Sequence, residues 1–184
     1  MARTPSTMVA LGTVAPDFTL TDTVSGKNIS LKNVNGEVAT IVMFICNHCP
    51  FVKHVNAELV KLANDYKDKG IGFVAINAND VINHPDDSPA LMRQVAKQLK
   101  YPFPYLYDES QDVAKAYDAA CTPDFFIYDK ELRLVYRGQL DDSRPGNEIP
   151  VTGKDIRNAL DCLVNDQAVP ELQRPSIGCN IKWK

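Results

Sequence analysis

The sequence has no long apolar run. Its longest uninterrupted apolar stretch, Ile41 to Cys46, is far too short to span a bilayer. The N-terminal stretch "MARTPSTMVALGTVAPDF" also lacks the apolar core, about seven residues or more, that a secretory signal needs. Basic residues are scattered and number 20 against 23 acidic ones, a net charge of -3. These absences predict a cytoplasmic protein with no nucleic-acid or membrane partner.

Cysteine is present in a number that does not suit a secreted disulfide framework. The chain has five cysteines in 184 residues, and an odd count in a chain of this length indicates a reducing compartment. Closely spaced cysteines in such a compartment are more often catalytic or metal-binding. The sequence also lacks internal repeats and shifts of composition. Its length therefore predicts one domain, residues 1–184.

The pair Cys46 and Cys49 lies in "MFICNHCPFVKH", directly after an apolar run. Val38–Ile45 is rich in β-branched residues and nearly continuous in apolar character, which predicts a strand covered on both faces. From Pro50 to Gly70 the apolar residues fall at helical intervals, and Ile71–Asn77 predicts a second buried strand. The two cysteines are therefore expected at the strand-to-helix turn of a βαβ unit.

The other predicted elements complete an α/β pattern. They are a β-hairpin over Asp17–Leu31, a helix from Ser88-Pro89 to Leu99, a strand over Pro104–Tyr107, a helix over Ser110–Tyr117, a hairpin around Asp129–Glu131 and a last helix over Ile156–Leu163 capped by Thr152. The tail from Val169 carries prolines and shows no periodicity.

Three interpretations of the cysteine pair are open. Free cysteines are often buried and inert. A structural zinc site needs four ligands, and the sequence has no second Cys-x-x-Cys to supply them. A helix N-terminus, with its unpaired N–H groups and the positive end of the helix dipole, stabilises a thiolate. That position favours a redox dithiol in which Cys46 attacks a disulfide and Cys49 resolves the mixed disulfide.

The chain resembles the thioredoxin-like superfamily over most of its length. "APDFTLTD…GKNISL" is similar to the N-terminal hairpin of redoxin-type proteins, and "CTPDFFIYD" is similar to the loop that carries a cis-proline. The resemblance implies an α/β thioredoxin-like fold, with a central mixed β-sheet flanked by helices and an N-terminal β-hairpin. It also implies that Pro123 is cis and that the backbone of Thr122 docks a partner polypeptide.

The same resemblance implies thiol-disulfide oxidoreductase activity without a cofactor or a metal. The expected partners are protein or small-molecule disulfides or peroxides and an upstream thiol reductant. His48 precedes the second cysteine, as in oxidising members of the superfamily, and is expected to tune the thiolate. A non-catalytic module that holds a metal or binds a partner is the alternative from another class.

Peroxiredoxins provide the alternative within the same class. Their peroxide-attacking cysteine aligns with Cys49 in "CNHCP", and Arg137 is the candidate for their catalytic arginine. However, Val42 stands in place of the motif's first proline and Cys46 in place of its threonine. Of the remaining cysteines, Cys121 and Cys179 are possible accessories to the site. Cys162 is expected to be a packing residue.

Overall fold

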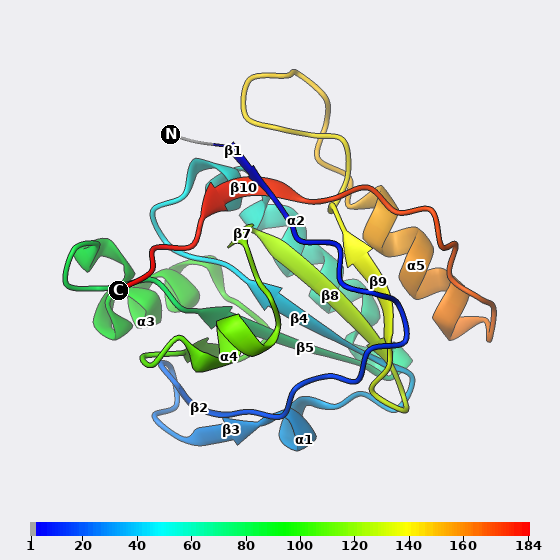
Figure 1. The fold of residues 1–184 in the computed structure, drawn as a ribbon, viewed down its shortest axis with the longest axis horizontal. Coiled ribbons are helices and arrows are strands. Elements are labelled where there is room, and N and C mark those ends of the chain that lie inside the picture. The colour runs from blue at the N-terminus through cyan, green and yellow to red at the C-terminus, as the bar shows by residue number, and fades with distance from the viewer. Residues whose placement is uncertain (1–2) are drawn as a thin grey trace.

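A seven-stranded mixed sheet forms the centre of the computed structural model, which describes residues 3–184 (Figure 1). Its strand order is β3-β2-β6-β5-β4-β8-β9. The strands are β2 (Thr19–Asp22), β3 (Asn28–Ser30), β4 (Ala39–Phe44), β5 (Ile71–Asn77), β6 (Tyr105–Tyr107), β8 (Asp124–Asp129) and β9 (Leu134–Gly138). The α/β thioredoxin-like architecture with a mixed sheet and an N-terminal hairpin, β2–β3, is confirmed.

Strand β4 is the centre of this sheet. It pairs in parallel with β5 and antiparallel with β8, so its backbone is bonded on both edges. All six of its residues are buried. Because both faces are covered, the strand is apolar throughout rather than alternating, as its sequence predicted. The residues that follow its carboxyl end, including Cys46, are therefore held in a fixed position.

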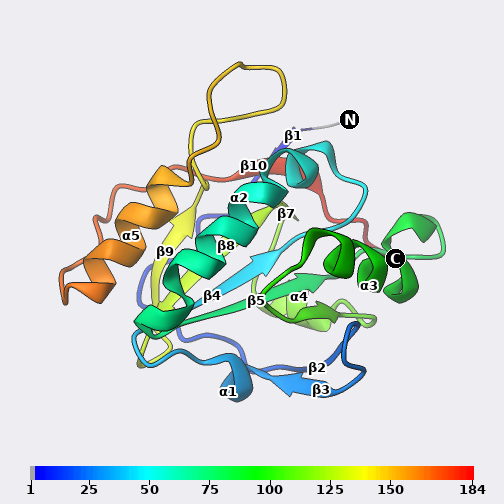
Figure 2. The same ribbon diagram turned by 180° about the vertical axis from the view of Figure 1, so that it is seen from behind.

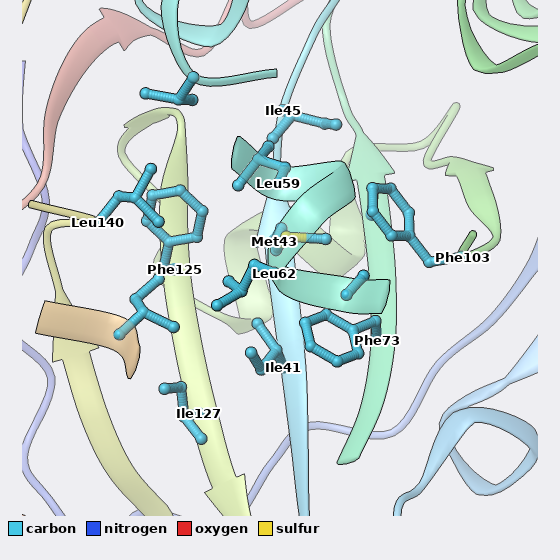
Figure 3. Packing of buried hydrophobic residues seen from close by; sticks show 14 of the residues in the cluster. Ile41, Met43, Ile45, Leu59, Leu62, Phe73, Phe103, Phe125, Ile127 and Leu140 are labelled. Carbon is cyan, nitrogen blue, oxygen red and sulfur yellow. The ribbon is translucent and has the colours of Figure 1, made fainter. Parts of the chain in front are cut away.

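Helices cover the two faces of the sheet unequally. Helices α2 (Pro50–Tyr66), α3 (Pro89–Leu99) and α5 (Lys154–Val164) lie on one face, and α4 (Asp112–Ala116) lies on the other (Figures 1 and 2). Figure 3 shows the core beneath α2, where Leu59 and Leu62 pack on Ile41, Met43 and Phe125. The chain also forms a short helix α1 (Leu31–Val34) and two 3-10 turns, η1 (Lys67–Lys69) and η2 (Pro85–Asp87).

A second, small sheet crosses the carboxyl end of β4 and was not expected from the sequence. It has the order β1-β10-β7, with β1 (Arg3–Pro5), β7 (Cys121–Thr122) and β10 (Ile177–Asn180). Strand β10 comes from the tail that shows no periodicity, and it pairs antiparallel with both neighbours. The C-terminal segment is therefore part of the folded structure, where β10 contacts α2 (Figure 1).

Two further details qualify the expectations. Helix α5 begins after Gly153, so the assignment of Thr152 as its cap is wrong. The carboxylate of Asp141 accepts the backbone N–H groups of both Thr152 and Gly153, and Gly153 takes the left-handed conformation that starts the helix. Within residues 3–184, no helix has the length and apolar character needed to cross a membrane.

The approach of β10 to β7 depends on Gly178. A Cβ atom there would lie 2.1 Å from the carbonyl oxygen of Thr122, which is backbone and cannot swing aside. Gly178→Ala is therefore expected to lower the free energy of unfolding by about 1–3 kcal/mol, measured by urea denaturation. Asn180→Ala, on an exposed side chain of the same strand, is the control and is expected to stay within about 0.5 kcal/mol of wild type. Equal stability of the Gly178→Ala and wild-type proteins would contradict this close contact.

Candidate active site

The two cysteines lie where β4 turns into α2, as the sequence predicted. Cys46 follows the end of β4 by two residues, and Cys49 is the N-cap residue of α2, with Pro50 in the first turn. Cys46 is 2% exposed and Cys49 is fully buried. The carbonyl of Cys49 accepts the backbone N–H of Lys53, so the N–H groups of the first turn have no partner within the helix, and that of Val52 serves the Cys49 sulfur.

Thr122 contacts both sulfurs. Its peptide bond to Pro123 is cis, which confirms the expectation for Pro123. The Thr122 hydroxyl lies 3.3 Å from Cys46 Sγ, and the Thr122 carbonyl oxygen lies 3.2 Å from Cys49 Sγ. The loop before β8 therefore faces the cysteine pair.

Cys179 brings a third sulfur to the site. It stands opposite Thr122 in the β10–β7 register, and its Sγ lies 2.7 Å from Cys49 Sγ. The Thr122 edge expected to dock a partner polypeptide is thus already paired with the chain's own C-terminal strand. Cys121 is different, because adjacent strand residues point to opposite faces. Its sulfur contacts the carbonyl of Pro123.

A buried carboxylate, Asp87, organises the residues between the two cysteines. One of its oxygens accepts the backbone N–H of Asn47 at 2.7 Å. The other lies 2.6 Å from His48 Nδ1 and 2.8 Å from Asn79 Nδ2. Tyr105 donates its hydroxyl to the Asn47 amide oxygen at 3.2 Å. These bonds fix the turn that separates Cys46 from Cys49.

Asp87 is the functional residue that the sequence did not reveal. It lies in a polar loop, 38 positions after Cys49, and nothing local distinguishes it from its neighbour Asp86, which is exposed. The hydrogen bond that His48 donates to the Asp87 carboxylate raises the pKa of His48, so the imidazolium is favoured beside the cysteines. The ring of His84 stacks on His48, with the centroids 5.4 Å apart.

Hydrogen-bond donors converge on Cys49 more than on Cys46. The thiol of Cys46, the thiol of Cys179 and the backbone N–H groups of Val52 and Cys179 lower the pKa of Cys49 to about 5 against the effect of burial. The pKa of Cys46 is raised by the neighbouring Cys49, by burial and by the negative charge of Asp87. The Thr122 carbonyl favours a protonated Cys49, but one carbonyl is outweighed by this set of donors. The reduced pair therefore carries its negative charge on Cys49, whereas the sequence led us to expect it on Cys46.

The contacts described for Arg137 within residues 3–184 do not include the sulfurs of Cys46 or Cys49. It is fully buried on β9, and its guanidinium donates to the carbonyl of Asp118 at 2.8 Å and to Asp124 at 3.4 Å. It also lies over the ring of Phe126, which belongs to the core on the sheet face opposite α2. These contacts give Arg137 a structural role in that core instead of the peroxide-binding role considered from the sequence.

Cys46, His48 and Asp87 each bring one potential metal-ligand atom within 4.8 Å of the others. The carboxylate oxygens of Asp87 are already hydrogen-bonded to Asn47, His48 and Asn79. A structural zinc ion usually takes four protein ligands. The three groups fit a hydrogen-bonded dithiol site more closely than a closed zinc site.

The geometry described above, a dithiol at a helix N-terminus facing a cis-proline loop, is that of a thioredoxin-like redox protein. The redoxin family model matches residues 10–156, and the chain belongs to the redoxin family. The thiol-disulfide oxidoreductase ResA of Geobacillus kaustophilus is 27% identical over 140 residues, which cover 74% of this chain and 75% of that protein.

Two solved structures are similar over nearly the full length. An uncharacterised conserved protein from Geobacillus kaustophilus has a TM-score of 0.99 and 62% identity, covering 100% of this chain and 97% of its own. A hypothetical protein from Sinorhizobium meliloti has a TM-score of 0.96 and 49% identity, covering 98% of both chains. Neither protein is assigned an activity. Both therefore support the fold, and the reaction has to be inferred from the geometry of the site.

The Asp87–His48 contact generates a pH-dependent prediction. The raised pKa of His48 means that its stabilisation is complete below the unfolded-state pKa of about 6.5 and is lost as the pH rises through the folded-state pKa. Asp87→Asn is therefore expected to lower the free energy of unfolding by about 1–3 kcal/mol at pH 6 and by less at pH 9. Urea denaturation at both pH values measures this. Asp86→Asn, at the exposed neighbour, is the control. If the difference in the free energy of unfolding between Asp87→Asn and wild type is the same at both pH values, the charged form of His48 does not contribute to stability.

The charge on Cys49 generates a second prediction. Because the pKa of Cys49 is lowered to about 5, the thiolate absorbance near 240 nm is expected to persist at neutral pH and to disappear with a midpoint near pH 5. Cys46→Ala removes the largest cause of this lowering and is expected to move the midpoint upward. Cys162→Ser, on α5, is expected to leave it unchanged. A midpoint near 8.5 in the wild-type protein would contradict the assignment.

Proposed function

We propose that the protein is a thiol-disulfide oxidoreductase that cycles Cys46 and Cys49 between a dithiol and an intramolecular disulfide. The observation that carries this proposal is the placement of the two cysteines, Cys46 after β4 and Cys49 at the N-cap of α2, with Thr122 in contact with both sulfurs. Because both sulfurs contact the same residue, a disulfide between them is expected to form without a rearrangement of the fold. No cofactor takes part in the exchange.

Cys46 is the attacking sulfur in this proposal. Cys49 is fully enclosed by Thr122 and Cys179, whereas Cys46 retains a small exposed area at the end of β4. The Cys49 thiolate accepts the proton of Cys46 as Cys46 attacks a substrate disulfide. One substrate thiol then leaves with that proton, and a mixed disulfide remains on Cys46.

The resolving step follows from the same geometry. Cys49, again a thiolate, attacks Cys46 Sγ, the mixed disulfide breaks, and the second substrate thiolate departs. The substrate gains two electrons and the protein holds one disulfide, so the step needs no further reactant. An external thiol reductant returns the pair to the dithiol. His48, held by Asp87, supplies positive charge close to the thiolate.

Peroxide reduction at Cys49 is the second candidate. The lowered pKa of Cys49 supports it, because a thiolate is the form that attacks a peroxide. The burial of Cys49 and the structural role of Arg137 count against it. Treating Cys46→Ser with hydrogen peroxide and a sulfenic-acid trap distinguishes the two. Stoichiometric labelling of Cys49 at a rate far above free cysteine favours the peroxidase.

The cytoplasm is the compartment proposed for this cycle, on the odd cysteine count. Cell fractionation tests it. Metal analysis of the purified protein, with thiol titration before and after chelation, tests the metal-holding alternative. A stoichiometric metal that masks Cys46 favours that alternative over the dithiol.

The central prediction is a reversible disulfide between Cys46 and Cys49. Both cysteines lie in one tryptic peptide, residues 33–53, so the disulfide closes a loop inside that peptide. Mild oxidation with diamide, acid quenching and alkylation are expected to give this peptide two hydrogens lighter and unalkylated, and dithiothreitol is expected to reverse the change. Cys162→Ser is expected to behave as wild type. Two alkylated cysteines in the peptide after oxidation would refute the redox assignment.

A further inference from the structure

The C-terminal strand β10 occupies the position that a docked substrate strand would take beside Thr122. It pairs with β7 in the register Cys179 opposite Thr122 and Asn180 opposite Cys121. Because Gly178 lacks a side chain, the two backbones approach closely at this point. The chain itself therefore presents a cysteine at the place where an external disulfide would otherwise be presented.

This strand is anchored on both sides of Cys179. Before it, the Ser176 hydroxyl donates to the carbonyl of Pro123 at 2.7 Å. After it, the backbone N–H of Lys182 donates to the Asn79 side chain at 2.8 Å, and its carbonyl accepts the backbone N–H of Asp80. Strand β1 covers the other edge, with Arg3 opposite Cys179. The position of the third sulfur is therefore fixed by the fold.

Cys49 lies in contact with both of its possible sulfur partners. It is hydrogen-bonded to Cys46 and lies 2.7 Å from the sulfur of Cys179. A sulfur that touches two thiols can form a disulfide with either, but only with one at a time. Cys121 and Cys162 have no such contact among the interactions described for residues 3–184.

We infer that Cys179 is a third redox cysteine and that the disulfide moves within the site from Cys46–Cys49 to Cys49–Cys179. This inference rests on the proposed dithiol cycle and adds to it. The thiolate of Cys179 attacks Cys49 Sγ, the Cys46–Cys49 bond breaks, and Cys46 leaves as a thiolate that takes up the proton given up by Cys179. One disulfide is exchanged for another, so no oxidant or reductant is consumed.

The surroundings of Cys179 change with the state of Cys49 in a way that permits this attack. In the reduced protein, burial, the hydrogen bond to Cys49 and the charge of Cys49 raise the pKa of Cys179 to about 12. The last two causes exist only while Cys49 is a thiolate. Once Cys49 is in a disulfide these two causes are absent. Burial, the largest cause, remains and is opposed by the charge of Lys182, so the pKa of Cys179 falls from its value in the reduced protein.

The exchange has a functional consequence for substrate turnover. It returns Cys46 to the thiol form while the protein is still oxidised, and it stores the disulfide under β10. Two oxidised forms then share the population. If K is the equilibrium ratio of the Cys49–Cys179 form to the Cys46–Cys49 form, the equilibrium constant for reducing the protein becomes smaller by a factor of one plus K.

Peptide mapping of the oxidised full-length protein tests the inference. Cys179 lies in the tryptic peptide of residues 158–182, since trypsin does not cut between Arg174 and Pro175. A Cys49–Cys179 disulfide therefore joins two peptides, whereas Cys46–Cys49 lies inside one. The Cys162→Ser protein is oxidised with diamide, quenched with acid and alkylated. We expect both products, the joined one with Cys46 alkylated and the link assigned to Cys49 by fragmentation.

Two variants sharpen the result. Cys46→Ser is expected to give the joined product in full, and Cys179→Ser only the internal loop, with easier reduction in a glutathione redox titration. The inference is overturned if fully oxidised protein contains only the Cys46–Cys49 loop, a result under which the proposed function stands and Cys179 is only a hydrogen-bond donor. Absence of both disulfides refutes the proposed function instead.

Discussion

Thr122 is the residue on which the arrangement of the site depends. Its hydroxyl contacts Cys46, its carbonyl contacts Cys49, and its backbone pairs with Cys179 on β10. Three sulfurs from segments far apart in the sequence are thereby brought around a single residue. A buried residue that contacts two thiols and pairs its backbone with the third cysteine constrains the positions of all three, so a displacement of one sulfur disturbs the packing of the other two.

Charge is distributed around this residue in a fixed pattern. The buried carboxylate of Asp87 accepts hydrogen bonds from Asn47, His48 and Asn79. These bonds partly offset the effect of its negative charge on the cysteines. It still disfavours a second anion at Cys46, and the pair places its charge on Cys49, where helix N–H groups and thiols donate to it. In the proposed cycle Cys46 attacks the substrate, whereas Cys49 carries the negative charge of the reduced protein. The first step therefore includes a proton transfer from Cys46 to Cys49.

The sequence predicted those parts of the site that local patterns determine. The apolar run of β4, the helical spacing after Pro50 and the cysteines between them identify the turn, because strand and helix periodicity are properties of neighbouring residues. Asp87 and β10 were not found for the same reason. Asp87 is one of two adjacent acidic residues in a loop, and only the tertiary fold buries it. Strand β10 has four residues without alternation, and its pairing with β1 and β7 depends on contacts with residues more than 50 positions away.

The pairing of β10 with β7 also limits how substrates reach the cysteines. An extended polypeptide that added a strand at Thr122 would have to displace β10, together with the bonds of Ser176 and Lys182 that anchor it. Breaking several buried hydrogen bonds at about 1 kcal/mol each, and exposing Cys49 and Cys179, opposes that route. On the other side of Cys46, the side chains of Asn47 and His48 are partly exposed. An added substrate strand and the chain's own β10 therefore compete for the same edge of β7.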